Sequence, residues 1–277
     1  MAAARTVTLP SGAEVPALGQ GTWRMGEDPA RRSDEIASLR RGLDLGMTLI
    51  DTAEMYGNGA AEELVGEAIS GRRDEVFLVS KVLPSHADML GTVDACRASL
   101  LRLGTDRIDL YLLHWRGSVP LRETVEALDS LVADGSIGSW GVSNLDVADL
   151  ADLPAGARPQ TDQVLYNLTR RGPEYDLMPL CRDLGIPLMA YSPVEQGRLL
   201  GHASLEAVAA AHGRTAAQVA LAWVLRTNDV IAIPKASAPA HVEDNHGALD
   251  LHLTDDDLRA LDEAFPPPPH KQPLEIL

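Results

Sequence analysis

Short apolar runs recur along the chain and are separated by longer amphipathic stretches. The eight runs lie at residues 17–18, 48–50, 76–79, 108–113, 137–142, 163–165, 187–190 and 230–233. Apolar and polar residues do not alternate strictly within them, as they would in a sheet with one face exposed to solvent. Such runs are typical of short strands in a parallel sheet that is covered on both faces. We therefore expect eight buried strands.

The stretches between these runs predict helices. The clearest of them lie at residues 33–45, 61–69, 89–103, 121–133 and 177–184. A glycine follows each one within two residues, and glycine commonly ends helices because it adopts the left-handed conformation at little cost. Strands that alternate with helices, without a linker, predict an α/β fold, namely a (β/α)8 TIM barrel in a single domain over residues 1–277. On this pattern alone, a doubly wound open sheet is the alternative.

The two ends of the chain carry separate signals. Residues 5–16 predict a small hairpin across the bottom of the barrel. Residues 266–277 begin with four prolines, which end the last helix and favour an extended tail. The first residues lack a long apolar segment, and no run elsewhere is long enough to span a membrane. We expect no signal peptide, no membrane contact and a cytoplasmic location.

Charge and cysteine content exclude several classes of function. The formal net charge of -16 argues against binding to nucleic acid or to anionic membranes, since both need a basic surface. An anionic ligand would need a few local cations and helix N-termini. The two cysteines, Cys96 and Cys181, form no CxxC pair, and the histidines lack metal-ligand spacing. We therefore expect a protein of a reducing compartment that holds no metal. Its oligomeric state stays open, with a monomer as the default.

Candidate chemistry appears where three predicted strands end in an ionisable residue. These residues are Asp51, Lys81 and His114, and Tyr56 follows Asp51 in a loop at the same rim. In a parallel barrel the functional groups project from the C-terminal ends of the strands, so these four side chains are expected to converge. Taken singly, each has a structural explanation, such as a capping aspartate or a core histidine. Taken together at successive strand ends, they favour function.

These residue types suit the reduction of a carbonyl group. A hydride that reaches a carbonyl carbon leaves an alkoxide, which needs a proton donor. A tyrosine is a poor acid at neutral pH, and we expect the Lys81 cation to lower the pKa of Tyr56. Asp51 would keep Lys81 charged and oriented. His114 would hydrogen-bond the carbonyl oxygen.

The motifs around these residues resemble the aldo-keto reductases. The resemblance begins with Leu49-Ile50-Asp51-Thr52-Ala53-Glu54-Met55-Tyr56-Gly57, Ser80-Lys81 and Leu112-Leu113-His114-Trp115. It continues with Gly141-Val142-Ser143-Asn144, Gln163-Val164-Leu165-Tyr166-Asn167, Ala190-Tyr191-Ser192-Pro193 and Ile231-Ala232-Ile233-Pro234-Lys235. Several motifs in the order of the family make the match specific over nearly the whole chain. Within the family, the chain is most similar to bacterial reductases of small carbonyls such as methylglyoxal.

The resemblance implies an NADPH-dependent reductase whose catalytic tetrad is Asp51, Tyr56, Lys81 and His114, with Tyr56 as the proton donor. It implies that Ser143, Asn144 and Gln163 bind the nicotinamide carboxamide and that Tyr191 stacks on the ring. Lys235 and Ser237 would meet the 2′-phosphate, Asp244 and Asn245 the adenine, and the loop 192–199 the pyrophosphate. The remaining residues implied at the cofactor are Thr22, Trp23, Ser192, Pro193, Gln196, Gly197, Ile233, Pro234 and His241.

One departure from the family concerns cofactor preference. Many members have an arginine six residues after the phosphate-binding lysine, where this chain has His241. An imidazole is largely neutral at pH 7 and binds phosphate less well than a guanidinium. We therefore expect a modest preference for NADPH, with weaker use of NADH.

The predicted substrate wall is apolar and consists of Trp23, Met55, Leu83 and Trp115. It favours small or aromatic aldehydes and 2-oxoaldehydes. Arg24 and Arg116 lie nearby in the sequence and would either contact a polar substrate group or remain solvated.

Three other functions stay open. A non-catalytic regulator that binds the cofactor would not need the tetrad, and a scaffold protein would need neither set of residues. An alcohol or sugar dehydrogenase working in the oxidative direction would use the same residues, so the sequence does not decide between the two directions.

Overall fold

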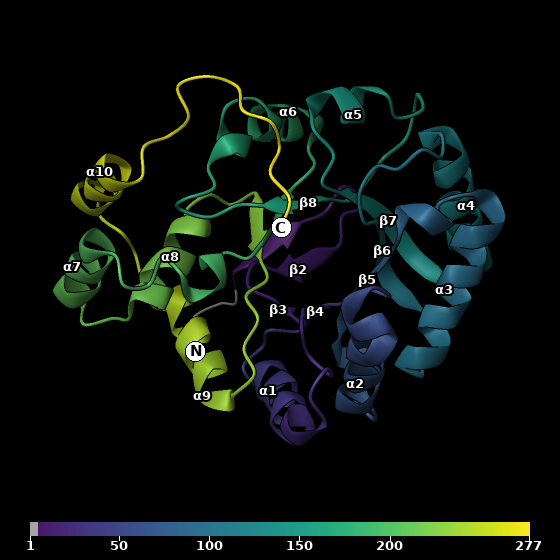
Figure 1. Cartoon of the computed structure of the whole chain (residues 1–277), viewed down its shortest axis with the longest axis horizontal. Helices are drawn as coiled ribbons and strands as arrows, with labels where there is room; N and C mark the ends of the chain where they lie inside the picture. The colour runs from purple at the N-terminus through teal and green to yellow at the C-terminus, as the bar shows by residue number, and fades with distance from the viewer. Residues whose placement is uncertain (1–4) are drawn as a thin grey trace.

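The computed structural model describes residues 5–277, and Figure 1 shows them as a sheet surrounded by helices. Residues 1–4, which belong to the segment where we expect no signal peptide, lie outside the described part. The strands of the large sheet are β3 (Gln20–Gly21), β4 (Leu49–Asp51), β5 (Phe77–Val82), β6 (Ile108–Leu113), β7 (Ile137–Ser143), β8 (Asp162–Leu165), β9 (Leu188–Tyr191) and β10 (Val230–Ala232). All neighbouring pairs are parallel and follow the order of the chain.

The sheet closes between its first and last strands. Parallel bridges join Leu18 to Ala232 and Gly21 to Lys235, so β3 lies against the β10 end of the sheet. This closure confirms the single-domain (β/α)8 barrel and excludes the doubly wound open sheet. The prediction of a first strand at residues 17–18 is wrong by a few residues. Within the large sheet, Ala17 and Leu18 pair with the β10 side alone, whereas pairing with β4 begins at Gln20.

Ten α-helices surround the barrel in the described residues. They are α1 (Arg32–Asp44), α2 (Ala60–Ile69), α3 (Met89–Leu103), α4 (Leu121–Asp134), α5 (Val147–Ala151), α6 (Leu177–Leu184), α7 (Ala203–His212), α8 (Ala216–Val224), α9 (Pro239–His246) and α10 (Asp255–Ala264). The five predicted helices, now α1 to α4 and α6, are confirmed to within one residue at each end. Helix α7 gave no clear periodic signal because alanine fills much of both its inner and outer faces, and α8 gave none because all its residues but Ala217 are buried.

The two ends of the chain lie on opposite faces of the barrel. Strands β1 (Thr6–Thr8) and β2 (Glu14–Pro16) form a separate antiparallel pair. The Ser11 N–H donates to Gln160 and Arg5 donates to the Thr227 carbonyl, both at 2.8 Å, and these partners precede β8 and β10. The hairpin therefore lies on the N-terminal face of the strands. After α10 the chain forms no helix or strand and returns to the centre of the barrel (Figure 1).

Burial explains the apolar runs. Every residue of β4, β8 and β10 is buried, because each strand has the barrel interior on one face and helices on the other. Among residues 5–277, no helix has both the length and the apolar character that a membrane crossing requires.

The closure between β3 and β10 generates a first prediction. A Cβ atom on Gly21 would lie 2.7 Å from the carbonyl oxygen of Ile233, so Gly21→Ala must push the two strands apart. We expect the free energy of unfolding to fall by about 1–3 kcal/mol, as for other overpacked sites. Thermal denaturation followed by circular dichroism measures the change. Gly172→Ala is the matched control, because no heavy atom lies within 4 Å of its added Cβ. A Gly21→Ala protein as stable as the wild type would contradict this account of the closure.

Candidate active site

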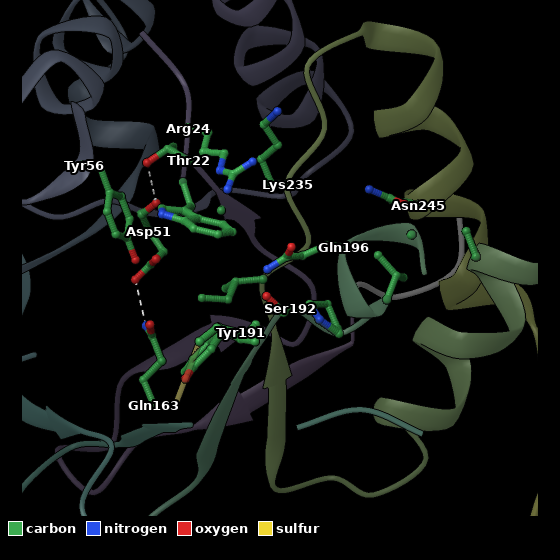
Figure 2. Close-up of a pocket in the computed structure, with 18 of the residues that line it drawn as sticks. Thr22, Arg24, Asp51, Tyr56, Gln163, Tyr191, Ser192, Gln196, Lys235 and Asn245 are labelled. Atoms are coloured by element: carbon green, nitrogen blue, oxygen red, sulfur yellow. Dashed lines mark hydrogen bonds between the residues drawn. The ribbon is translucent and has the colours of Figure 1, made fainter. Parts of the chain in front are cut away.

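A cavity of about 680 Å³ opens at the C-terminal ends of the strands, and Figure 2 shows 18 of the residues that line it. Most of the predicted site residues line it: Thr22, Trp23, Asp51, Met55, Tyr56, His114, Trp115, Ser143, Asn144, Gln163, Tyr191, Ser192, Pro193, Gln196, Gly197, Ile233, Lys235, His241, Asp244 and Asn245. Lys81 is buried next to it and bonded to two of its lining residues. Leu83, Pro234 and Ser237 do not line it.

The pairing of β4 with β5 brings three of the tetrad residues together. Asp51 lies opposite Val79 in this pair, and the alternation of a strand places Lys81 on the same face as Val79. The Lys81 ammonium, fully buried, donates to Asp51 Oδ2 at 2.8 Å and to the Thr52 carbonyl at 2.8 Å. Its third partner is the Tyr56 hydroxyl at 3.2 Å. One cation thus joins the carboxylate to the phenol.

Burial dominates the ionisation of this group. It raises the pKa of Asp51 and lowers the pKa of Lys81, and the attraction between the two charges opposes both shifts. Burial also raises the pKa of Tyr56 well above its usual value, and the Asp51 charge raises it further. The expectation that Lys81 lowers the pKa of Tyr56 is therefore not met. The phenol keeps its proton throughout the neutral range.

His114 stands beside Tyr56 as a neutral imidazole. The two ring centroids are 5.8 Å apart. Burial lowers the pKa of His114 to about 2, and the Lys81 charge acts in the same direction. Its Nδ1 atom is buried without a hydrogen-bond partner among the described residues. A buried N–H without an acceptor is costlier than an unused lone pair, so the proton belongs on Nε2. His114 is then a neutral donor at the cavity.

A second carboxylate lies behind Lys81. Glu62 is fully buried in the first turn of α2, where it accepts a 2.6 Å hydrogen bond from Ser80 and pairs with Arg102 at 2.6 Å. Its charge also favours the protonated form of Lys81. An acidic residue in the first turn of a helix is commonly solvated, but Glu62 is buried because α3 and β5 cover the first turn of α2.

Amide and hydroxyl groups from β7, β8 and β9 form the floor of the cavity. The Asn144 amide donates to the His114 carbonyl at 3.1 Å and to Ser143 Oγ at 3.0 Å, while its Oδ1 accepts from the Tyr191 hydroxyl at 3.1 Å. The Gln163 amide donates to Asp51 Oδ1 at 2.7 Å (Figure 2). This bond leaves the Gln163 Oε1 atom as an acceptor, and it gives Asp51 a second fixed partner.

Cations gather at the other end of the cavity, where Figure 2 shows Arg24 beside Lys235. The Lys235 side chain is exposed at this rim. Partial desolvation and the charges of Arg31 and Arg24 lower its pKa, against the opposing charges of Glu35 and Glu27. The Arg24 guanidinium stacks on the Trp23 ring at 4.5 Å. In a chain of net charge -16, such a group of positive charges is a specific feature. Arg24, which the sequence placed near the substrate, belongs to this end.

The adenine-side residues predicted from the sequence lie beyond these cations. Asp244 and Asn245 come from α9, and Figure 2 shows Asn245 near Lys235. The Asp244 carboxylate accepts hydrogen bonds from Thr215 Oγ1 at 3.0 and 3.1 Å. Thr215, the N-cap residue of α8, also lines the cavity and was not predicted. Its capping motif is visible in the sequence, but its position beside Asp244 is not.

The apolar wall is only partly as predicted. Trp23, Met55 and Trp115 line the cavity, whereas Leu83 does not. The Leu83 N–H donates to Glu54 at 2.7 Å, which fixes the backbone after β5 but leaves its side chain outside the lining.

The tail contributes to this wall, and Arg116 is held elsewhere. Ile276 and Leu277 line the cavity, and neither residue was among the predicted site residues. Arg116 pairs with Asp149 at 2.7 Å and with Asp152 at 2.8 Å, so its charge is already matched. Within residues 5–277, no group of three or more histidine, cysteine or acidic side chains is arranged to hold a metal ion.

Comparisons with known proteins agree with this geometry. The model of the aldo/keto reductase family matches residues 17–265. The chain is 52% identical to methylglyoxal reductase YeaE of Escherichia coli over 95% of both proteins. It is 35% identical to glyoxal reductase of Bacillus subtilis over 93% of this chain and 91% of that protein.

A solved structure gives the same result. The aldo-keto reductase of Klebsiella pneumoniae in complex with NADPH superposes with a TM-score of 0.97 at 50% identity, covering 99% of this chain and 100% of that one. The family match, the barrel and the buried lysine–aspartate–tyrosine group lead to one conclusion. The chain belongs to the aldo/keto reductase family.

Proposed function

We propose that the protein uses NADPH to reduce small or aromatic aldehydes, 2-oxoaldehydes and ketones to alcohols. The observation that carries the proposal is the Tyr56 hydroxyl at 3.2 Å from the buried Lys81 ammonium, at one end of a cavity whose other end is cationic. Relatives named for methylglyoxal and glyoxal reduction, and a close structure crystallised with NADPH, support it.

The residues of the cavity fit this cofactor. Ser143, Asn144 and Gln163 provide hydroxyl and amide groups that can satisfy both the oxygen and the nitrogen of a carboxamide. Lys235 and Arg24 provide charge for phosphate groups at the opposite end. Bound NADPH would supply the hydride. NADH, which lacks the 2′-phosphate, would be held less tightly.

Each tetrad residue then has its own role in protonating or orienting the carbonyl oxygen. Tyr56 holds a proton at neutral pH, because its pKa is raised. As that proton moves to the forming alkoxide, negative charge appears on the phenol oxygen, and the Lys81 cation stabilises it. Asp51 keeps Lys81 charged and oriented despite its burial. His114, a neutral donor, orients the carbonyl oxygen.

Two alternatives have weaker support. A non-catalytic regulator would need the cofactor end but not the Asp51–Lys81–Tyr56 group, which is assembled here with short hydrogen bonds. An alcohol or sugar dehydrogenase would use the same residues in reverse, so the ratio of cofactor forms would decide the direction. The cytoplasmic location, the monomeric state and the absence of nucleic-acid binding stay predictions.

The central experiment follows NADPH oxidation with methylglyoxal, a nitro-substituted benzaldehyde and an aldose. The apolar wall predicts at least a tenfold higher kcat/KM for the first two, which is about 1.4 kcal/mol in transition-state stabilisation. Tyr56→Phe should lower kcat by about two to four orders of magnitude and leave NADPH affinity nearly intact, since the hydroxyl acts in proton transfer.

A matched control removes the same atom elsewhere. Tyr175→Phe deletes a hydroxyl from an exposed ring and should keep wild-type kinetics. Full kcat in Tyr56→Phe would overturn the assignment of the proton donor, and a preference for the aldose would overturn the apolar-wall argument.

The depressed pKa of His114 makes a prediction about pH. Because this pKa is lowered to about 2, the imidazole stays neutral throughout the neutral pH range. Tyr56, whose pKa is raised, also keeps its proton as the pH rises above neutral. Carbonyl reduction in single turnover should therefore be flat between about pH 6 and 8, without the ionisation near 6.5 of an ordinary histidine. A step in that range that vanishes in His114→Gln would contradict this reading.

Lys235 provides the test of cofactor preference. Lys235→Ala should weaken NADPH binding by about 1.5–3 kcal/mol, the range for hydrogen bonds to charged groups, and change NADH binding little. Fluorescence titration with the two cofactors measures both constants, and NADH is the internal control. Equal losses for both would show that Lys235 does not contact the 2′-phosphate.

A further inference from the structure

The loop that follows β9 has an unusual backbone. Ser192, Glu195 and Gln196 all have positive φ angles, of 48°, 49° and 55°, although none of them is glycine. Such conformations persist only where the surroundings hold them. Here the Asn167 amide holds the loop by donating to the Ser192 carbonyl at 2.9 Å and to Glu195 Oε2 at 2.8 Å. Ser192 and Gln196 line the cavity, so the loop is shaped in advance for what binds there.

A single guanidinium joins this loop to the C-terminal tail. The Glu195 side chain is only 6% exposed, and its Oε1 accepts from Arg170 at 3.1 Å and from Arg198 at 2.7 Å. Through another nitrogen, Nη1, Arg170 donates to Glu275 in the tail at 2.5 Å. The planar guanidinium presents its donors in a fixed fork, so two carboxylates bound to it are held in a fixed relation.

The tail is anchored twice before it reaches the cavity. Lys271 pairs with Asp176 at 2.8 Å and with Asp146 at 3.2 Å, and Glu275 forms the second anchor. The next residues, Ile276 and Leu277, line the cavity.

The last stretch of the tail also reaches a cofactor-side residue. Leu277 lines the same cavity as Tyr191, and its backbone is close enough to act on the pKa of the Tyr191 hydroxyl, which burial raises. Figure 1 shows the tail leaving α10, passing α6 and returning to the middle of the barrel.

We propose that Arg170 is a positioning residue that ties the loop 192–197 to the tail, so that the protein holds NADPH and the carbonyl substrate through one connected unit. This inference rests on the proposed function. Releasing the tail from Arg170 frees Ile276 and Leu277 at the substrate end. Without its bond to Glu275, the Arg170 guanidinium is also held less firmly, so it fixes Glu195 and the loop less well. Retention of the cofactor thus depends on a tail residue that does not line the cavity.

Glu275→Gln tests the connection, because it removes the charge but keeps the shape of a half-exposed side chain. We expect NADPH to dissociate about two- to fivefold faster, the upper range for a partly exposed ion pair. Stopped-flow measurement of protein fluorescence, which needs no turnover, gives this rate. KM for methylglyoxal should rise by a similar factor, whereas kcat should change little. Arg170→Gln should show both effects, and the double variant should be no worse than Arg170→Gln alone.

Arg182→Gln is the matched control, since it breaks an Arg–Asp pair of similar exposure on the surface, between Arg182 and Asp229, and should leave both values at wild type. An NADPH dissociation rate in Glu275→Gln equal to that of the wild type would overturn the proposal. The proposal would also be overturned if the increases in NADPH dissociation rate of the two single variants multiplied in the double variant, because the two residues would then act separately. A wild-type protein that binds NADPH but reduces no carbonyl would refute the proposed function, while the dissociation rates would still decide on Arg170.

Discussion

The site depends on keeping a charged lysine inside the barrel. Lys81 has no exposed surface, and burial by itself favours the neutral amine. Asp51 opposes that tendency by direct pairing, and Glu62 opposes it from behind. Removing one partner of such a buried pair typically costs about 3–5 kcal/mol, because the remaining charge stays uncompensated. The burial of the Lys81–Asp51 pair is costly for the stability of the fold. The pair also holds a cation beside the phenol of Tyr56, where the proposed reaction develops negative charge.

Closure of the barrel makes this arrangement possible. Asp51 receives one hydrogen bond from Lys81 on the neighbouring strand and another from Gln163 on β8, across the barrel. An open sheet would keep β4 and β8 apart, so the second bond requires a closed barrel. The close approach of Gly21 to the β10 side is part of that closure. The hydrogen bonds that hold Asp51 beside Lys81 therefore depend on the packing that closes the barrel.

The two ends of the cavity have different chemistry, and different segments supply it. Strand ends provide the amide groups and the turn after β4 provides the Tyr56 hydroxyl, whereas other loops and helices provide Lys235, Arg24 and Asp244. The loop after β9 and the tail lie between these ends. Their connection through Arg170 explains how segments with strained or irregular backbone keep a defined shape: each is held by ion pairs and amide hydrogen bonds rather than by a sheet.

Residue patterns alone predicted an α/β fold, with the barrel favoured over an open sheet, and five helices to within one residue. They also predicted that Asp51, Tyr56, Lys81 and His114 gather at one rim. This was possible because burial on both faces of a strand, helix periodicity and the position of a strand end are local properties. Strand one was misplaced because its residues pair on one side before the other. The burial of Glu62, the Gln163–Asp51 bond, the exclusion of Leu83 and the return of Ile276 and Leu277 to the cavity came only from the tertiary structure. Each depends on which distant segment lies opposite a side chain, and closure of the barrel, not local sequence, sets that relation.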